Sequence, residues 1–304
     1  MNFQQPHTLL MIRPKSFGFN QQTESSNAFQ QQGNADLDCV KKEFSTMVDL
    51  LLAHEVPVVV FDDTPNPTKP DAIFPNNWIS FHEDGKVILY PMFAENRRHE
   101  RRLDIVDQLK QNFQVREILD FSDRERGGGF LEGTGSIVFD HLDHIAYACR
   151  SPRTTENVLM AVCKQLKYRS IVFDAVDESG RPVYHTNVMM NIGEKFAVVC
   201  IDSITKDADQ EIVIGSLAES GRKLVAISFA QMRAFAGNML EVKTRTGENV
   251  VLMSDTALNS LLPGQINAIS QFSEVLPISI PTIERVGGGG VRCMVAGIHL
   301  PPRK

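Results

Sequence analysis

The sequence predicts an α/β fold built as a closed ring of five similar units, and three observations carry that prediction. Hairpin patterns, in which two short apolar runs flank a tight turn, recur along the chain. An amphipathic helical stretch and a β-branched run follow most of these hairpins, so each unit contains two strands, a helix and a closing strand. The aligned starts of the units lie 51–58 residues apart, a period typical of repeat architectures.

Four units are continuous in the chain. We expect their hairpins at residues 77–90, 135–149, 187–201 and 238–253, where Asp-Gly, Gly-X or other polar pairs separate apolar runs. Helices are expected at 95–113, 152–167, 205–220 and 255–272, and Ser151-Pro152 is typical of a helix start. Closing strands are expected at 171–173, 224–227 and 275–280.

The fifth unit is divided between the two ends of the chain. We expect residues 291–300 to pair with 8–12, with a helix at 36–54 and a closing strand at 58–61. This arrangement closes the ring, removes free sheet edges and makes residues 1–304 a single domain. The segment from Asn20 to Gln32, rich in Gln, Ser and Asn, is expected to be a mobile loop that covers the axis. On periodicity alone, an ordinary α+β domain with similar hairpins remains an alternative.

Composition excludes several classes of function. The chain has 304 residues, a net charge of −6 and scattered Lys and Arg residues, which argues against nucleic acid as a partner. No apolar run approaches the roughly 20 residues that a membrane span needs. The five cysteines are far apart and form neither a disulfide framework nor a metal pattern, so we expect a reducing, cytoplasmic compartment. His141 and His144 fall in an expected hairpin turn, and we expect no metal.

Equivalent points of each unit should face the axis of the ring. A thiol, an imidazole and a carboxylate from different units would then meet in one pocket, which is the set required for nucleophilic thiol catalysis. The residues concerned are Asp71, Asn77, Glu132, His185, Asn187 and Cys293. Most cysteines are simply buried hydrophobes, and His185 could be a core histidine. Cys293 differs because four glycines, Gly287 to Gly290, precede it and allow close backbone approach to a ligand.

Four short motifs resemble those of the guanidino-group-modifying superfamily, which contains arginine deiminases, dimethylarginine hydrolases and amidinotransferases. The motifs are Pro70 to Asn77, Leu131 to Gly135, Tyr184 to Asn187 and Gly290 to Cys293. The resemblance extends from about Ile12 to Leu300 and is strongest to the citrulline-utilisation hydrolases. It implies a five-bladed α/β propeller, the pentein fold, of ββαβ repeats with pseudo-fivefold symmetry.

The resemblance also implies roles for individual residues. By position in these motifs, Cys293 would be the nucleophile, His185 the general acid and base, and Glu132 its acidic partner. Asp71 would bind substrate. Arg98 and Arg153 would hold the substrate α-carboxylate, with Arg97 as the neighbouring alternative to Arg98.

Two positions depart from the deiminase pattern. Asn77 and Asn187 stand where aspartates usually bind the guanidinium cation. An amide side chain can donate to a ureido oxygen, whereas a carboxylate buried against that oxygen would be costly. We therefore expect the substrate to be citrulline or another ureido compound rather than arginine.

The expected reaction is hydrolysis of citrulline to ornithine, carbon dioxide and ammonia through a covalent cysteine intermediate, without a cofactor. Arginine dihydrolase, arginine deiminase and amidinotransferase activities are alternatives. A non-catalytic ribosome-binding protein of the same fold is the alternative from another class. A homo-oligomer is possible, and the partner expected is a small amino acid, citrulline or arginine.

Overall fold

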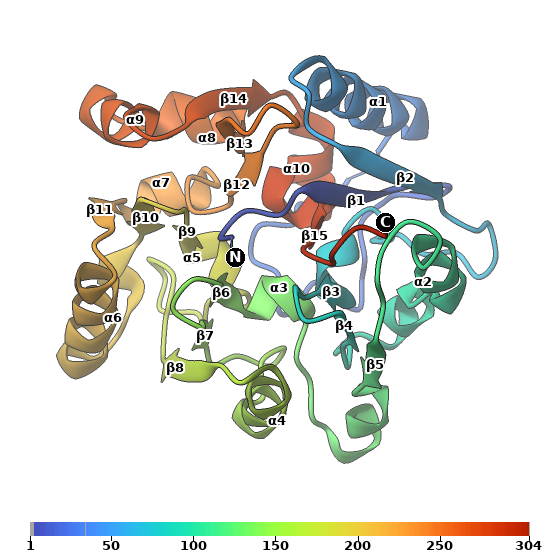
Figure 1. Ribbon diagram of the computed structural model, residues 1–304, viewed down its shortest axis with the longest axis horizontal. Helices are drawn as coiled ribbons and strands as arrows, with labels where there is room; N and C mark the ends of the chain where they lie inside the picture. The colour runs from blue at the N-terminus through green and yellow to red at the C-terminus, as the bar shows by residue number, and fades with distance from the viewer. Residues whose placement is uncertain (1–2, 34, 304) are drawn as a thin grey trace.

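The computed structural model describes residues 3–33 and 35–303. Five three-stranded sheets surround a central axis like the blades of a propeller (Figure 1). In each sheet the middle strand pairs antiparallel with one neighbour and parallel with the other. The five-bladed α/β propeller predicted from the sequence is thus confirmed, and the ordinary α+β alternative is wrong.

Four blades are continuous in the chain, as predicted. Their strands are β3 (Ile79–Phe81), β4 (Lys86–Leu89) and β5 (Glu117–Asp120); β6 (Val138–Asp140), β7 (Ile145–Cys149) and β8 (Arg169–Phe173); β9 (Met190–Ile192), β10 (Phe196–Val199) and β11 (Lys223–Ala226); and β12 (Leu240–Lys243), β13 (Asn249–Ser254) and β14 (Glu274–Ile278). All four predicted hairpins form. Strand β5 has no counterpart among the closing strands expected from the sequence.

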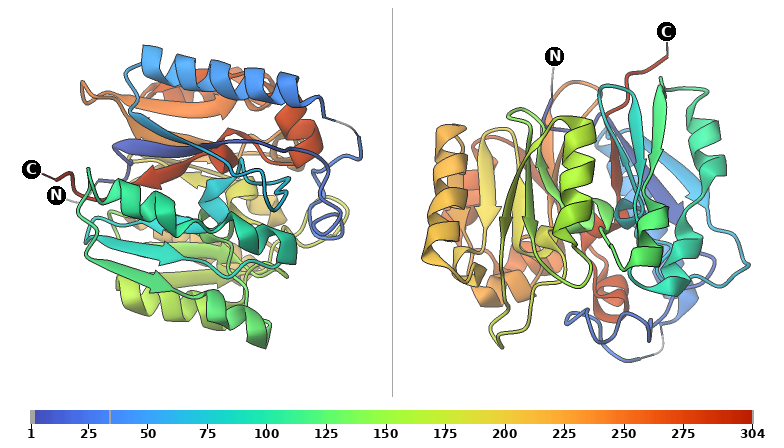
Figure 2. Two further views of the ribbon diagram at one scale, coloured as in Figure 1. Left: turned by 90° about the vertical axis from the view of Figure 1, so that its right-hand side faces the viewer. Right: turned by 90° about the horizontal axis from the view of Figure 1, so that it is seen from below.

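The fifth blade joins the two ends of the chain, as expected. Its strands are β15 (Ala296–Ile298), β1 (Thr8–Arg13) and β2 (Val58–Asp62), in that spatial order. Both termini emerge on one side of the ring, and the loop of residues 20–32 lies on the opposite side (Figure 2). The ring therefore has two distinct axial ends.

A helical segment connects the second and third strands of each blade. These segments are α1 (Leu37–Ala53), η2 (Glu95–Glu100) with α2 (Leu103–Leu109), α4 (Glu156–Leu166), α6 (Asp207–Glu219), and α8 (Asp255–Ser260) with α9 (Pro263–Ser270). They form the outer rim in Figure 1. None of the helices in the described part of the chain is long and apolar enough to cross a membrane.

Three helix boundaries differ from the sequence prediction. The stretch 95–113 is broken because Arg97 and Glu100 turn inward and pair with each other. The stretch 255–272 is broken before Pro263, because proline favours extended backbone in the residue before it. The helix expected from Pro152 begins at Glu156 instead, because residues 151–154 form a tight turn.

Short helical turns, rather than strands, stand at four of the five aligned starts of the units. They are η1 (Pro75–Asn77), α3 (Gly133–Ser136), α5 (Thr186–Met189) and η5 (Val291–Met294). They pack closely at the axis: a Cβ on Gly133, which has a φ of +46°, would lie 2.2 Å from the Asn76 carbonyl oxygen. The remaining elements are η3 (Ser122–Gly127), η4 (Ile201–Ser203), α7 (Phe229–Arg233) and α10 (Pro281–Gly287). The four turns at the unit starts place polar side chains on the axis, while apolar residues fill the space between blades.

Candidate active site

A small cavity lies at the end of the axis covered by the 20–32 loop. It has a volume of about 20 Å³ and is lined by Asn27, Asp71, Phe74, Asn77, Arg97, Arg153, Tyr184, His185, Gly287, Gly288, Gly289 and Cys293. The structure thus brings together most of the site residues expected from the sequence. A cavity of this size has room for about one water molecule, so an amino acid can enter only when part of the wall moves.

Cys293 lies in the turn η5 and is 5% exposed. Its sulfur accepts hydrogen bonds from Asn238 Nδ2 at 3.3 Å and from Asn187 Nδ2 at 3.6 Å. Burial raises the pKa of the thiol, although the Asn238 hydrogen bond and the nearby Arg292 charge oppose that rise. The resting residue is therefore a thiol with two amide donors in place to stabilise a thiolate.

His185 and Glu132 form a buried pair, with His185 Nε2 2.8 Å from Glu132 Oε2. Burial lowers the pKa of His185 to about 4, against the opposing effect of Glu132. Burial by itself would raise the pKa of Glu132, but Arg153, His185 and Arg97 together hold it well below its usual range. His185 is therefore neutral near pH 7 and donates Nε2–H to the ionised carboxylate. Its Nδ1 remains a proton acceptor, the form that a general base requires.

Asn77 is held in a defined orientation. Its Oδ1 accepts a hydrogen bond from Arg97 Nη1 at 2.9 Å, and because a guanidinium can only donate, this contact fixes which way the amide points. Asn77 Nδ2 has no hydrogen-bond partner in the described part of the chain, and neither has Asn187 Oδ1. Buried polar atoms without partners are uncommon, and because Asn77 lines the cavity, its Nδ2 is a candidate for contact with a substrate.

Asp71 provides a carboxylate in the same cavity. Its Oδ2 accepts from Asn20 Nδ2 at 2.7 Å and lies 3.5 Å from Arg97 Nε, while Oδ1 has no partner among the described residues. This leaves one carboxylate oxygen available to accept an N–H bond from a ligand.

The structure does not place Arg98 at the site, where the resemblance put it. Arg98 is partly exposed, contacts the Met92 carbonyl oxygen and Glu125, and does not line the cavity. Arg97 lines it instead, 2% exposed, and forms two 2.8 Å bonds with Glu100. The turn of η2 points Arg97 inward. The sequence alone could not show which of the two adjacent arginines faces the cavity.

Arg153 is 1% exposed and lies beside the His185–Glu132 pair. Its Nη1 is 3.3 Å from Glu132 Oε2, and its guanidinium stacks over the Tyr184 ring at 4.8 Å. Its other nitrogens donate to Ser26 Oγ at 2.8 Å and to the Thr23 carbonyl oxygen at 3.4 Å. Loop oxygens therefore occupy the donors that a substrate carboxylate would need.

The 20–32 loop covers the cavity, as expected from its position in the sequence. Besides its contacts with Asp71 and Arg153, Asn27 Nδ2 donates to the carbonyl oxygens of Gly287 and Gly288, and Gln31 N donates to that of Arg285. Polar bonds hold most of the loop in place, and Phe29 adds an apolar contact by packing on Tyr184 and Phe235.

Sequence reasoning missed Asn238 as a site residue. Asn238 donates to Cys293 Sγ and to the Asn187 carbonyl oxygen at 3.1 Å. The repeat alignment contained the signal, because Asn238 stands at the same point of its unit as Asn77 and Asn187. In the described residues, no group of three or more His, Cys, Asp or Glu side chains is arranged to hold a metal.

Comparison with solved structures shows the same fold in several proteins. Unliganded AgrE superimposes with a TM-score of 0.76 at 16% identity, covering 98% of this chain and 40% of AgrE. The N-terminal domain of ArgZ, described as an arginine dihydrolase of the ornithine–ammonia cycle in cyanobacteria, gives 0.73 at 13% identity over 97% of this chain and 98% of the domain. A dimethylarginine dimethylaminohydrolase variant, as an adduct with S-methyl-L-thiocitrulline, gives 0.66 at 13% identity, covering 96% and 99%.

Comparison of sequences identifies the family. No curated protein matches the chain. The family model described as N,N dimethylarginine dimethylhydrolase, eukaryotic, matches residues 13–300. The chain therefore belongs to the N,N dimethylarginine dimethylhydrolase family and has the pentein fold.

Proposed function

We propose that this protein hydrolyses the ureido group of citrulline to ornithine, carbon dioxide and ammonia. The observation that carries the proposal is the orientation of Asn77. Arg97 engages Asn77 Oδ1, so the amide can offer substrate only its NH₂ group. That group suits the carbonyl oxygen of a ureido compound and does not suit a guanidinium, which has donors alone.

The proposed reaction begins with a neutral thiol and a neutral imidazole. As Cys293 Sγ attacks the ureido carbon, its proton passes to His185 Nδ1, directly or through the substrate. The Asn187 and Asn238 amide groups stabilise the developing negative charge on sulfur. When the carbon–nitrogen bond to the ornithine side chain breaks, His185 returns the proton to the leaving nitrogen.

The second half of the reaction releases the enzyme. The carbamoyl group left on sulfur is attacked by water, from which His185 takes a proton while Glu132 stabilises the imidazolium. The carbon–sulfur bond breaks, the thiol regains its proton, and the carbamic acid formed decomposes to carbon dioxide and ammonia. In this scheme Arg153 holds the substrate α-carboxylate once Ser26 and Thr23 have withdrawn with the loop.

Arginine dihydrolysis is the second candidate, and Asp71 is the observation that favours it. Glu100 and Glu132 are paired with Arg97 and Arg153, whereas Asp71 retains a carboxylate oxygen without a partner among the described residues. That oxygen could bind a guanidinium. The family name refers to dimethylarginine, and a structural relative is described as an arginine dihydrolase, so arginine-type substrates must be tested beside citrulline.

The test is parallel incubation of the purified protein with citrulline, arginine and dimethylarginine, followed by identification of all products. The proposal expects ornithine and ammonia from citrulline, and no dimethylamine from dimethylarginine. Formation of ornithine from arginine with transient citrulline would favour the dihydrolase. The citrulline proposal fails if citrulline is inert while either guanidino compound is consumed.

A further inference from the structure

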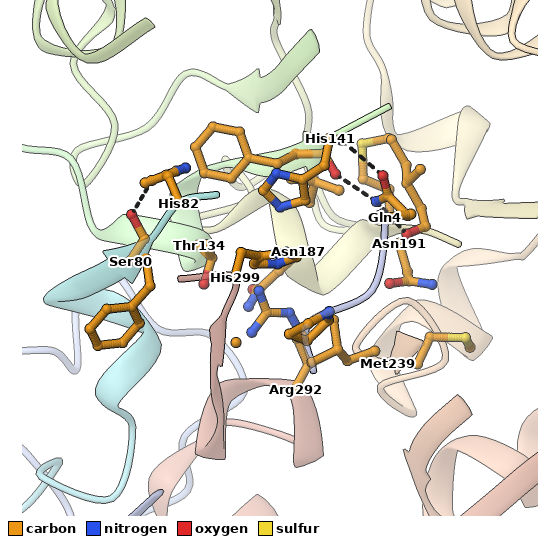
Figure 3. A pocket seen from close by; sticks show the side chains of 18 residues that line it. Gln4, Ser80, His82, Thr134, His141, Asn187, Asn191, Met239, Arg292 and His299 are labelled. Atoms are coloured by element: carbon orange, nitrogen blue, oxygen red, sulfur yellow. Dashed lines mark hydrogen bonds between the residues drawn. The ribbon is translucent and has the colours of Figure 1, made fainter. Parts of the chain in front are cut away.

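A second cavity lies on the axis at the opposite end of the ring, near the chain termini. It has a volume of about 50 Å³, and its lining includes Gln4, His141, Asn191, Arg292 and His299 (Figure 3). Asn187 also lines this cavity, although its Nδ2 reaches the Cys293 sulfur on the catalytic side. Asn187 and Cys293 thus lie in contact between the two cavities.

Arg292 is the unusual residue of this second cavity. The buried arginines 97, 153 and 222 are each paired with a carboxylate, namely Glu100, Glu132 and Asp140. Within residues 3–33 and 35–303, Arg292 has no carboxylate partner, and its guanidinium donates from Nη1 to the Val295 carbonyl oxygen at 2.9 Å. Burial lowers the pKa of Arg292 only to about 10, so the guanidinium stays charged near pH 7. Arg292 is half-buried, and a charge drawn partly out of water without a partner is costly.

The groups around Arg292 supply further donors. Asn191 Nδ2 is buried without a partner in the described chain. The rings of His141 and His299 lie 4.1 Å apart between centroids, and both line the cavity. His141 Nδ1 contacts the Tyr168 hydroxyl at 2.9 Å, so that contact does not use Nε2. Figure 3 shows these side chains gathered around one space. The cavity therefore holds one N–H donor without a partner, Asn191 Nδ2, beside a single fixed positive charge.

We propose that this axial cavity binds a small oxyanion of about the size of formate, nitrate or bicarbonate, held by Arg292 and Asn191 beside His141 and His299. A guanidinium binds such planar anions through two parallel hydrogen bonds. The volume exceeds that of a single water site and leaves room for a few heavy atoms. The proposed reaction places no part of the substrate in this cavity.

The pocket outside this cavity is compatible with the proposal. It shares His82, His141 and His299 with the cavity and is also lined by Glu83 and Asp84. Asp84 is paired with Lys86, so its charge is compensated at the surface. An anion therefore gains its favourable contacts at the inner end, where Arg292 stands.

An anion bound at Arg292 would raise the pKa of the Cys293 thiol. Arg292 and Cys293 are adjacent in the turn η5, and the positive charge favours the thiolate. Neutralising that charge lowers the thiolate fraction, and the thiolate is the reactive form. Small anions that bind in this axial cavity, on the other side of Cys293 from the substrate cavity, would thus slow the reactions of the thiol.

The test measures binding of sodium formate and sodium nitrate by calorimetry, with sodium chloride at equal ionic strength as the reference. We expect saturable binding that weakens by at least about tenfold in Arg292→Gln, because a hydrogen-bonded charge is lost. Asn191→Leu should weaken binding by a smaller factor. Arg233→Gln, which removes an exposed arginine paired with Glu178, should leave it unchanged. Absence of saturable binding to the wild-type protein overturns the proposal.

A second readout separates the axial site from the catalytic cavity. Formate should slow alkylation of Cys293 by iodoacetamide in the wild type and in Arg153→Ala, and should have no effect in Arg292→Gln. If the effect instead disappears in Arg153→Ala and persists in Arg292→Gln, the anion binds at the substrate carboxylate position and the axial site is wrong. Asn191→Leu provides the same comparison should Arg292→Gln fail to fold. Neither readout depends on which substrate the enzyme uses.

Discussion

The substitution Asn77→Asp decides between a ureido and a guanidino substrate. In the native protein, Asn77 Oδ1 accepts from Arg97 Nη1 at 2.9 Å, and Nδ2 is left for the substrate. Aspartate keeps the contact with Arg97 and strengthens it, but it removes the only donor that this position can offer. A ureido oxygen would then face a carboxylate instead of an N–H group.

The expected magnitude follows from that lost contact. Leaving a buried polar group without its hydrogen bond costs about 1–3 kcal/mol, which corresponds to a loss of roughly tenfold to a hundredfold in kcat/KM for citrulline. Arginine should gain, because a guanidinium can bond to the new carboxylate. The gain will be smaller than for an isolated carboxylate, since Arg97 compensates part of the charge and already pairs with Glu100.

The assay compares kcat/KM for citrulline and arginine in the wild type and in Asn77→Asp. Asn187→Asp is the matched control: it places a carboxylate where Nδ2 now donates to the Cys293 sulfur, so it should reduce the reaction of both substrates together. A citrulline-to-arginine ratio that stays constant or rises in Asn77→Asp would refute the reasoning from hydrogen-bond complementarity.

Three further predictions follow from the site and its surroundings. Cys293→Ser should abolish turnover with an unchanged unfolding transition, and full activity in this variant would exclude the nucleophile assignment. Arg153→Ala should raise KM more than it lowers kcat, whereas a fall in kcat at constant KM would remove Arg153 from the carboxylate site. Burial lowers the pKa of His82 to about 4, of His141 to about 3 and of His185 to about 4, so the unfolded chain binds more protons between these values and about 6.5. Stability is therefore complete above about pH 6.5 and should fall below it by about 1.4 kcal/mol per pH unit for each histidine; urea unfolding at pH 7 and pH 5.5 that gives equal free energies would contradict this.

The fold could be predicted because its repeat appears in local patterns. Each hairpin has its own turn residues, and α1 and α6 lie close to their expected ranges. The failures arose where tertiary contacts override local signals. Pro152 follows a serine as in a helix start, yet the chain turns there so that Arg153 reaches Glu132. The strand β5 is short and half-exposed, so it has no strong apolar pattern.

The site could be predicted in outline because symmetry places equivalent residues together. Cys293, His185 and Glu132 come from different blades, yet the aligned positions pointed to all three. Orientation could not be predicted, because it depends on side-chain partners. The choice of Arg97 over Arg98 depends on the turn of η2 and on Glu100. The position of Arg292 away from any described carboxylate likewise depends on which side chains the folded ring brings near it.

The most direct test of the proposed reaction is capture of the covalent intermediate. The protein is mixed with citrulline, quenched in acid within the first turnover, digested and examined by mass spectrometry. A carbamoyl group on the peptide that contains Cys293, absent from Cys293→Ser and lost on longer incubation, is the predicted result. If citrulline is consumed and no adduct forms on that peptide, or if the adduct lies on one of the other four cysteines, the proposed chemistry at Cys293 is wrong.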